Sequence, residues 1–211
     1  AEGPLSRTAK SSFLVNYRYS LIAAVQKLGL SVGTGNATPY YQDVNFKVNI
    51  PTKKAGVFSL FGLGGESHIN FEANDDKNLY STNDGSLRDR NFKSLTGVTG
   101  ITHTYFFNPT TSGRLMLAAS GFDSRYEETF FNQPVPGNQA FYKKNVQVKF
   151  TAAYTINKKF SSKDQLTAGI IADRSRLRLR MDYIPDGDSV LQTFFNTKQQ
   201  VTLLRGFTNL A

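Results

Sequence analysis

Two segments of the chain, 40–50 and 145–157, alternate between apolar and polar residues with a period of two. This alternation is typical of a β-strand that has one apolar and one polar face. We therefore predict that the apolar residues of both segments lie on one side of a sheet. These residues are Val44, Phe46, Val48, Ile50, Val146, Val148, Phe150, Tyr154 and Ile156.

The same reading along the rest of the chain predicts about eight strands, most of them ~10–14 residues long, in an all-β antiparallel meander. Strands of this length are long enough to cross a bilayer at the tilt of a barrel. Residues 21–28, with the sequence LIAAVQKL, instead have the apolar spacing of one or two helical turns. The other six predicted strands are 12–19, 56–64, 94–107, 114–125, 165–183 and roughly 197–207.

The connections between the predicted strands are short at one end and long at the other. Short turns at one end and long polar loops at the other are typical of an outer-membrane β-barrel, whose long loops face outside. A soluble β-sandwich alternates in the same way and remains an alternative, as does a small autonomous barrel. The predicted short turns are 6–10, 51–54, 108–113 and 157–164. The predicted extracellular segments are 21–39, 66–93, 127–143 and roughly 185–196.

Composition favours the barrel and excludes two other classes. The 211 residues contain no Cys, which excludes a disulfide scaffold and a Cys-based zinc site. No apolar run is longer than five residues, the length of Leu21–Val25, so no transmembrane helix is expected. The 17 Phe and 10 Tyr are many for a chain whose mean hydropathy is −0.35. A barrel can direct such rings outward, into lipid and into interfacial girdles.

The first third of the chain resembles the barrel of TonB-dependent outer-membrane receptors of the Bacteroidetes type. The resemblance lies in the order of five motifs, while the remainder of the chain matches only in its rhythm of strands, turns and loops. The motifs are EGP at 2–4, FLVNYRYS at 13–20, YQD followed by VNFKVN at 41–49, PTKKAG at 51–56 and FSLFGLGG at 58–65.

This resemblance implies a barrel of 22 strands with a plug domain, which imports a nutrient ligand (a glycan, a peptide or a metal chelate) with energy delivered through TonB. It also implies the bacterial outer membrane as the location. The implied partners are outer-membrane lipid and lipopolysaccharide, the plug and remaining barrel strands, TonB and a surface lipoprotein.

The chain has no plug-like segment or TonB box, is too short for 22 strands, and ends on Ala211 without the usual aromatic residue. We therefore expect residues 1–211 to be a single segment of a larger barrel, beginning at 2–4 with the tail of a strand. A closed eight-stranded barrel would pair its first strand with its last. We accordingly expect strand 12–19 not to pair with strand 197–207.

The densest charge feature is a stripe of arginines at every second position of one strand, in a chain of net charge +9. Arginine binds carboxylates and phosphates with two parallel hydrogen bonds, so the stripe is the candidate ligand-binding site. It would face either the lumen or lipopolysaccharide. The alternative is a solvated strand balanced by Asp173 and Asp182. The four residues are Arg174, Arg176, Arg178 and Arg180.

The other candidate sites have simpler interpretations. His68 and His103 lie 35 residues apart without metal-ligand spacing, so a strand-end or lumen histidine is expected and no metal site. The glycine-rich 62–65 segment opens no helix, which predicts a bulge or a close backbone approach. Asp75, Asp76, Asp84, Asp186 and Asp188 have no calcium-loop spacing. No cofactor, no nucleic-acid partner and no enzymatic activity are predicted, since no recognisable motif supports any of them.

Overall fold

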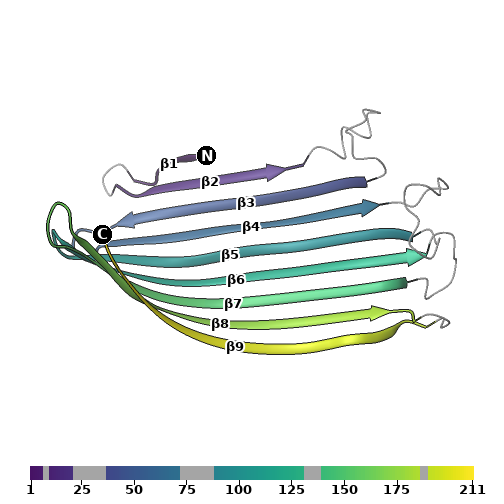
Figure 1. Ribbon diagram of the computed structural model, residues 1–211. Coiled ribbons are helices and arrows are strands. Elements are labelled where there is room, and N and C mark those ends of the chain that lie inside the picture. The colour runs from purple at the N-terminus through teal and green to yellow at the C-terminus, as the bar shows by residue number, and fades with distance from the viewer. Residues whose placement is uncertain (7–9, 21–36, 72–87, 131–138, 186–189) are drawn as a thin grey trace.

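The computed structural model describes residues 1–6, 10–20, 37–71, 88–130, 139–185 and 190–211. Within them the chain forms one antiparallel sheet of nine strands in sequence order, which confirms the predicted all-β meander (Figure 1). The strands are β1 (Glu2–Pro4), β2 (Ser12–Tyr19), β3 (Ala37–Pro51), β4 (Val57–Phe71), β5 (Arg88–Asn108), β6 (Thr111–Phe130), β7 (Gln139–Lys159), β8 (Gln165–Tyr183) and β9 (Gln192–Leu210).

Most strands are longer than the sequence predicted, whereas β2 and β8 have the predicted bounds. β3 and β4 have 15 residues each, and β5 to β9 have 19 to 21. The prediction of ~10–14 residues for most strands was wrong because it relied on alternation. Alternation fades where both faces become polar, although the backbone ladder continues. β4 and β5 extend into the predicted loop 66–93, and β6 and β7 into 127–143. A 20-residue strand is about 66 Å long, about twice what a barrel strand needs to cross a bilayer.

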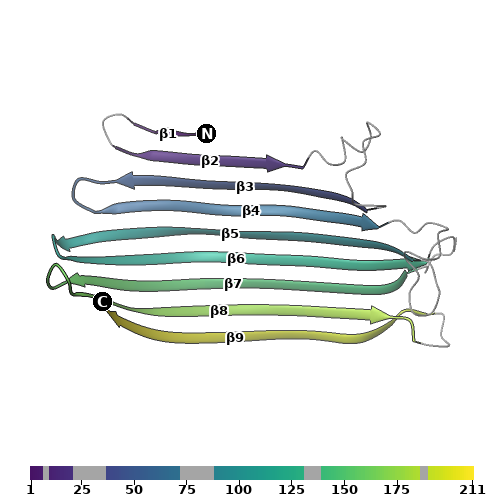
Figure 2. The ribbon, with the colours of Figure 1, turned by 45° about the horizontal axis from the view of Figure 1, so that its top comes forward.

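Short turns join the strands at one end of the sheet, as expected (Figure 2). In the turn after β3, Thr52 Oγ1 accepts a hydrogen bond from the Ala55 amide at 2.9 Å. Gly56 has a φ of 81°, and a Cβ there would lie 2.1 Å from the Thr104 carbonyl oxygen, so only glycine fits. In the turn after β7, Ser161 Oγ accepts a hydrogen bond from the Asp164 amide at 3.1 Å.

The segments that join the strands at the opposite end lie mostly outside the described residues. The helical turns predicted at 21–28 and the acidic residues Asp75, Asp76, Asp84, Asp186 and Asp188 belong to them. The centre of the predicted short turn 6–10 also lies outside the described residues. These features remain predictions.

The two faces of the sheet differ in chemistry. In an antiparallel sheet, residues directly opposite one another point to the same face. One row across six strands is entirely apolar and defines what we call the apolar face; it consists of Val48, Leu60, Ile101, Leu117, Ala152 and Ala172. The nine apolar residues predicted to share a side all lie on this face. The opposite, polar face carries a row of Asn49, Ser59, Thr102, Met116 and Ala153.

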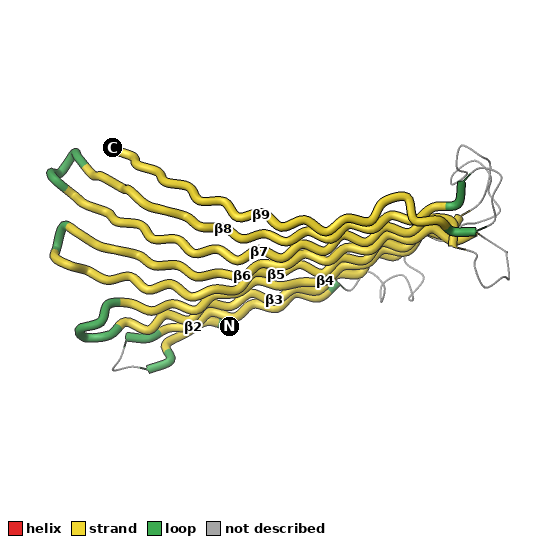
Figure 3. The backbone as a smooth tube through the Cα atoms, turned by 90° about the horizontal axis from the view of Figure 1, so that it is seen from below, coloured by secondary structure: helices red, strands yellow, loops and turns green. Residues whose placement is uncertain are grey.

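The sheet is a single twisted layer, as the view from below in Figure 3 shows. Among the described residues only one apolar side chain, Ala140, is buried, so no conventional core exists there. β2 pairs with β1 and β3, and β9 pairs with β8. The expectation that strand 12–19 does not pair with strand 197–207 is therefore confirmed for the residues described.

Candidate functional site

The four arginines of the predicted stripe lie on β8, are solvent-exposed and point to one face. Arg174 is directly opposite Phe150, and Arg176 is opposite Val148. The stripe therefore lies on the apolar face. It is on the opposite side of the sheet from the polar row that contains Thr102 and Met116.

The alternation of β8 reverses along its length. From Leu166 to Ala172 every second residue is apolar and points to the apolar face, with Ile170 exposed by 59%. Beyond Asp173 the arginines occupy that face, and Leu177 and Leu179 point to the polar face. Asp173 thus marks the position along β8 where the apolar face becomes charged.

Local partners neutralise only part of the stripe. Arg180 forms an ion pair with Asp182 at 2.9 Å, and its guanidinium lies 6.0 Å from the centre of the Tyr142 ring. Arg176 donates a hydrogen bond to the Gln200 side chain at 3.2 Å. Asp173, which the alternative of a solvated strand named as a counter-charge, points to the polar face instead. It occupies an odd-numbered position of β8, one residue out of phase with the arginines.

Asp173 is buried and ties three strands together on the polar face. Its carboxylate accepts a hydrogen bond from Thr151 of β7 at 2.6 Å and is paired with Arg205 of β9. Its exposed fraction is 7%, so the two partners compensate for the removal of a charge from water. Asp173 therefore has a structural role in holding β7, β8 and β9 together.

Sequence reasoning missed a second basic feature on the apolar face. Lys93 of β5 is opposite Arg125 of β6, Arg125 is opposite Lys144 of β7, and Lys144 is opposite Arg180 of β8. We call these four residues the cation row. Neighbouring members of the row are 19 to 36 positions apart along the chain, so only the register of the sheet brings them together.

The two histidines lie on the apolar face rather than in a polar lumen. His103 stacks on Phe58, with ring centres 4.3 Å apart, near the short turns. Its Nε2 lies 2.6 Å from the Ala55 carbonyl oxygen. His68 stacks on Tyr40 at 4.6 Å, near the other end of β4. Within the described ranges, no group of three or more His, Asp or Glu residues is arranged to hold a metal ion.

The glycine-rich segment of β4 is a place of close approach, as expected. A Cβ on Gly62 would lie 2.4 Å from the Phe46 ring, and one on Gly65 would lie 2.8 Å from the Gln42 carbonyl oxygen. The register of β4 with β3 and β5 continues through both positions without a shift, so neither is a bulge.

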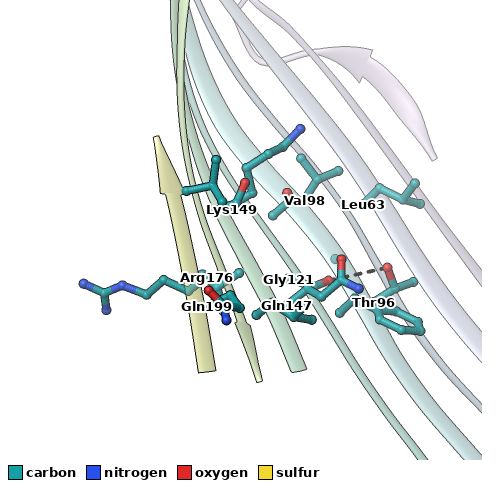
Figure 4. Close-up of a pocket in the computed structure, with 15 residues that line it drawn as sticks. Leu63, Thr96, Val98, Gly121, Gln147, Lys149, Arg176 and Gln199 are labelled. Atoms are coloured by element: carbon teal, nitrogen blue, oxygen red, sulfur yellow. Dashed lines mark hydrogen bonds between the residues drawn. The ribbon is translucent and has the colours of Figure 1, made fainter. Parts of the chain in front are cut away.

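The polar face contains a hollow of about 620 Å³ over β4 to β9. Its lining mixes amide, hydroxyl and ammonium groups with apolar side chains, as Figure 4 shows for Thr96, Gln147, Lys149 and Gln199 beside Leu63 and Val98. The Arg176 side chain extends away from the other labelled residues, in keeping with its place on the opposite face (Figure 4).

A polar cluster lies on the polar face at the loop end of β5 and β6. Glu128 forms ion pairs with Arg88 at 3.1 Å and with Arg90 at 3.6 Å, and it accepts a hydrogen bond from the Tyr126 hydroxyl at 2.5 Å. Burial, the hydrogen bond and the negative charge of Glu128 raise the pKa of Tyr126 to about 12. The phenol therefore remains a neutral donor at physiological pH.

Among the residues described, no helix has the length and apolar character needed to span a bilayer. No protein-family model matches the chain, and no curated protein matches it significantly.

Two solved structures share the fold. The ferric yersiniabactin uptake receptor FyuA from Yersinia pestis is similar over 95% of this chain and 31% of its own, with a TM-score of 0.54 and 9% identity. The ferric-catecholate import receptor Fiu from E. coli K12, in its open form, is similar over 92% of this chain and 41% of its own, with a TM-score of 0.54 and 10% identity. The chain thus spans less than half of either receptor, and the likeness shows that it shares an antiparallel β fold with part of each.

Proposed function

We propose that this chain is part of the transmembrane barrel of a TonB-dependent outer-membrane receptor that imports a nutrient ligand. The apolar face is the observation that carries the proposal. Ile101, Leu117 and Ile170 are 54%, 43% and 59% exposed on a face that no second layer of described residues covers. An apolar area of this extent on a water-exposed surface would promote aggregation, whereas lipid stabilises it.

Aromatic residues at both ends of the apolar rows support the membrane interpretation. Toward the short turns, Tyr105 packs edge-on against Phe107, with ring centres 5.2 Å apart. Toward the loops, Tyr19 packs edge-on against Tyr40 at 5.5 Å. Aromatic girdles of this kind border the apolar band of outer-membrane barrels at both interfaces.

The two alternative functions fit the structure less well. A soluble β-sandwich would bury the apolar face against a second sheet, but the described residues form one sheet. A small autonomous barrel would pair β2 with β9, and no such pairing exists within the described ranges. The free edge of β9, 19 residues long, favours a larger barrel in which another strand pairs with it.

In the proposed receptor, residues 1–211 are one segment of a barrel of 22 strands, and the polar face with its hollow of about 620 Å³ lines the lumen. There it would contact the plug or the passing ligand. The ligand is a glycan, a peptide or a metal chelate; both neighbours are named for ferric chelates, but at 9% and 10% identity that likeness concerns the fold. The Bacteroidetes type rests on the sequence motifs alone and remains a prediction.

Barrel size can be tested with cysteine pairs, because the chain contains no Cys. In outer membranes that carry the parent protein, Ala152→Cys with Ala172→Cys should cross-link on oxidation, since these residues are directly opposite. Tyr17→Cys with Thr202→Cys, on β2 and β9, should not. Efficient cross-linking of the second pair would show a small closed barrel and contradict the proposal.

Transport requires a separate test. Cells with and without the parent gene should be compared for uptake of labelled ferric chelates, oligosaccharides and peptides, before and after the proton gradient is collapsed. We expect at least one class to require both the gene and the gradient. If no class of ligand required both the gene and the gradient for its uptake, the import function would be contradicted. The barrel assignment would remain intact.

A further inference from the structure

The apolar face changes from apolar to strongly basic toward the loops, which membrane crossing alone does not require. Four successive rows across β4 to β9 contain eight lysines and arginines against two carboxylates, Glu66 and Asp123. The next row toward the loops adds Glu127 and Asp182, so a positive excess remains. The eight cations are Lys93, Arg125, Lys144, Arg174, Arg176, Arg178, Arg180 and Lys198.

The cation row places like charges directly opposite one another on four adjacent strands. Such pairs destabilise an antiparallel sheet, because opposite Cβ atoms are only about 4.5–5.5 Å apart. Internal compensation is incomplete. Lys144 lies 3.9 Å from Asp123, and Arg180 is paired with Asp182. In the part of the chain that the structure describes, Lys93 and Arg125 form no ion pair.

The location of these cations indicates the chemistry of what binds them. Arg174 follows Ala172 at the next position on the same face, so the basic rows continue directly from the apolar rows. A soluble anion would need the cations alone. A ligand that uses both regions has anionic groups at one end and acyl chains at the other, which describes an anionic lipid.

We propose that the cation row and the arginine stripe bind the phosphates of an outer-leaflet glycolipid, whose acyl chains lie on the apolar rows. This inference rests on the proposed function, since it requires the apolar face to contact lipid. The guanidinium groups of Arg125 and Arg178 provide paired donors that match phosphate oxygens. Exposed Lys93 adds a third charge, which has no ion-pair partner among the described residues. Bound phosphates would remove the repulsion within the cation row.

The test uses the full receptor in nanodiscs with two lipids, lipid A carrying two phosphates and its dephosphorylated form, with retention measured by native mass spectrometry. The variant Lys93→Gln/Arg125→Gln/Arg178→Gln removes three cations from the apolar face. The control, Lys47→Gln/Arg114→Gln/Lys143→Gln, removes three from the polar face at residues that form no ion pair among those described. The first variant should fold at least as well as wild type, because it removes like-charge repulsion.

We expect the apolar-face variant to lose retention of phosphorylated lipid A by roughly 10- to 100-fold, and the control to retain it. Dephosphorylated lipid A should bind wild type and variant equally. Equal retention of the phosphorylated lipid by both variants would overturn the inference. Displacement of the lipid by millimolar inorganic phosphate would also overturn the inference, because it would show that the site binds a soluble anion. If a fluorescent label at Ala152 of the apolar face is quenched by brominated acyl chains but these results fail, only this inference is wrong and the barrel assignment stands.

Discussion

On the apolar face, the half of the sheet next to the short turns differs from the half next to the loops. In the turn half, Leu60, Ile101 and Leu117 form a continuous apolar row, and Tyr105 and Phe107 border it. In the loop half, the equivalent positions hold the arginine stripe and the cation row. The ladder continues unchanged between the two halves, so backbone pairing does not cause the difference.

The comparison shows that the length of a strand and the length of its apolar part are separate properties of this sheet. Strands of 19 to 21 residues continue well beyond the apolar rows. β8 makes the change at Asp173, where the alternation keeps its period but exchanges which face is apolar. We infer that the turn half spans the bilayer and that the loop half extends out of it.

The largest expected effect is on the free energy of unfolding when an arginine is introduced at different depths on the apolar face. Leu117→Arg, in the turn half, should lower the free energy of unfolding by ~2–4 kcal/mol, since it places a cation near the bilayer midplane. Val148→Arg, level with Arg176, should cost only ~0–1 kcal/mol because the side chain can reach the interface. Refolding titrations of the receptor into phosphatidylcholine vesicles measure both. Equal penalties would show that the two halves do not differ in depth.

A smaller effect is expected at the residue where the two halves meet. Asp173→Ala removes the acceptor for Thr151 and Arg205. It should cost about 1–3 kcal/mol, the range for removing one partner of a buried polar contact. Ser175→Ala, the next residue on the same face of β8, is the control and should change stability by less than about 0.5 kcal/mol. Urea unfolding in detergent micelles distinguishes them. A neutral Asp173→Ala would mean that the three strands do not depend on this contact.

Two glycines of the sheet differ in how much space a Cβ atom would have. A Cβ on Gly100 would lie 2.6 Å from the Leu117 carbonyl oxygen, whereas one on Gly121 would meet nothing closer than 3.9 Å. Gly100→Ala should therefore cost about 1–3 kcal/mol through backbone displacement. Gly121→Ala should be neutral or stabilise by up to about 1 kcal/mol through the unfolded state. Thermal unfolding of both variants provides the comparison, and a destabilised Gly121→Ala would contradict the open space seen there.

The smallest effect concerns Tyr126 in the loop half. Its pKa is raised from 10.0 to about 12, so its stabilising contribution is fully present below pH 10 and is lost as the pH rises through 12. Ultraviolet absorption should show a tyrosine titrating near pH 12 that is missing in Tyr126→Phe. Glu128→Gln, which removes the nearby negative charge, should lower that pKa. Titration near pH 10 in the parent protein would contradict the buried hydrogen bond.

Much of the fold followed from alternation and turn composition. The turn at 160–164 sets the register of β7 with β8, so the pair Lys144–Arg180 could have been derived from the sequence once that turn was placed. The pair Lys93–Arg125 could not, because a register shift between Phe106 and Asn108 separates it from the turn at 109–110. The strand ends toward the loops could not, because polar residues on both faces leave no periodic signal.

The complete cation row required the structure. Arg125 pairs with Lys144 across the long connection between β6 and β7, whose length does not determine a register. A register shift between Glu128 and Thr129 near that connection adds a residue that no sequence pattern shows. Likewise, the place of the stripe on the apolar face depended on the alignment of β8 with β7, since a one-residue slip would move all four arginines to the polar face.

The most direct test of lipid contact uses two neighbouring alanines on β7. Ala152 lies on the apolar face, opposite Leu117, and Ala153 lies on the polar face, opposite Met116. Ala152→Cys and Ala153→Cys, each labelled with bimane in the full receptor, should be placed in bilayers containing lipids brominated on their acyl chains. We predict strong quenching at position 152 and little at position 153. Equal quenching at both positions, or stronger quenching at 153, would contradict the assignment of the apolar face to the membrane.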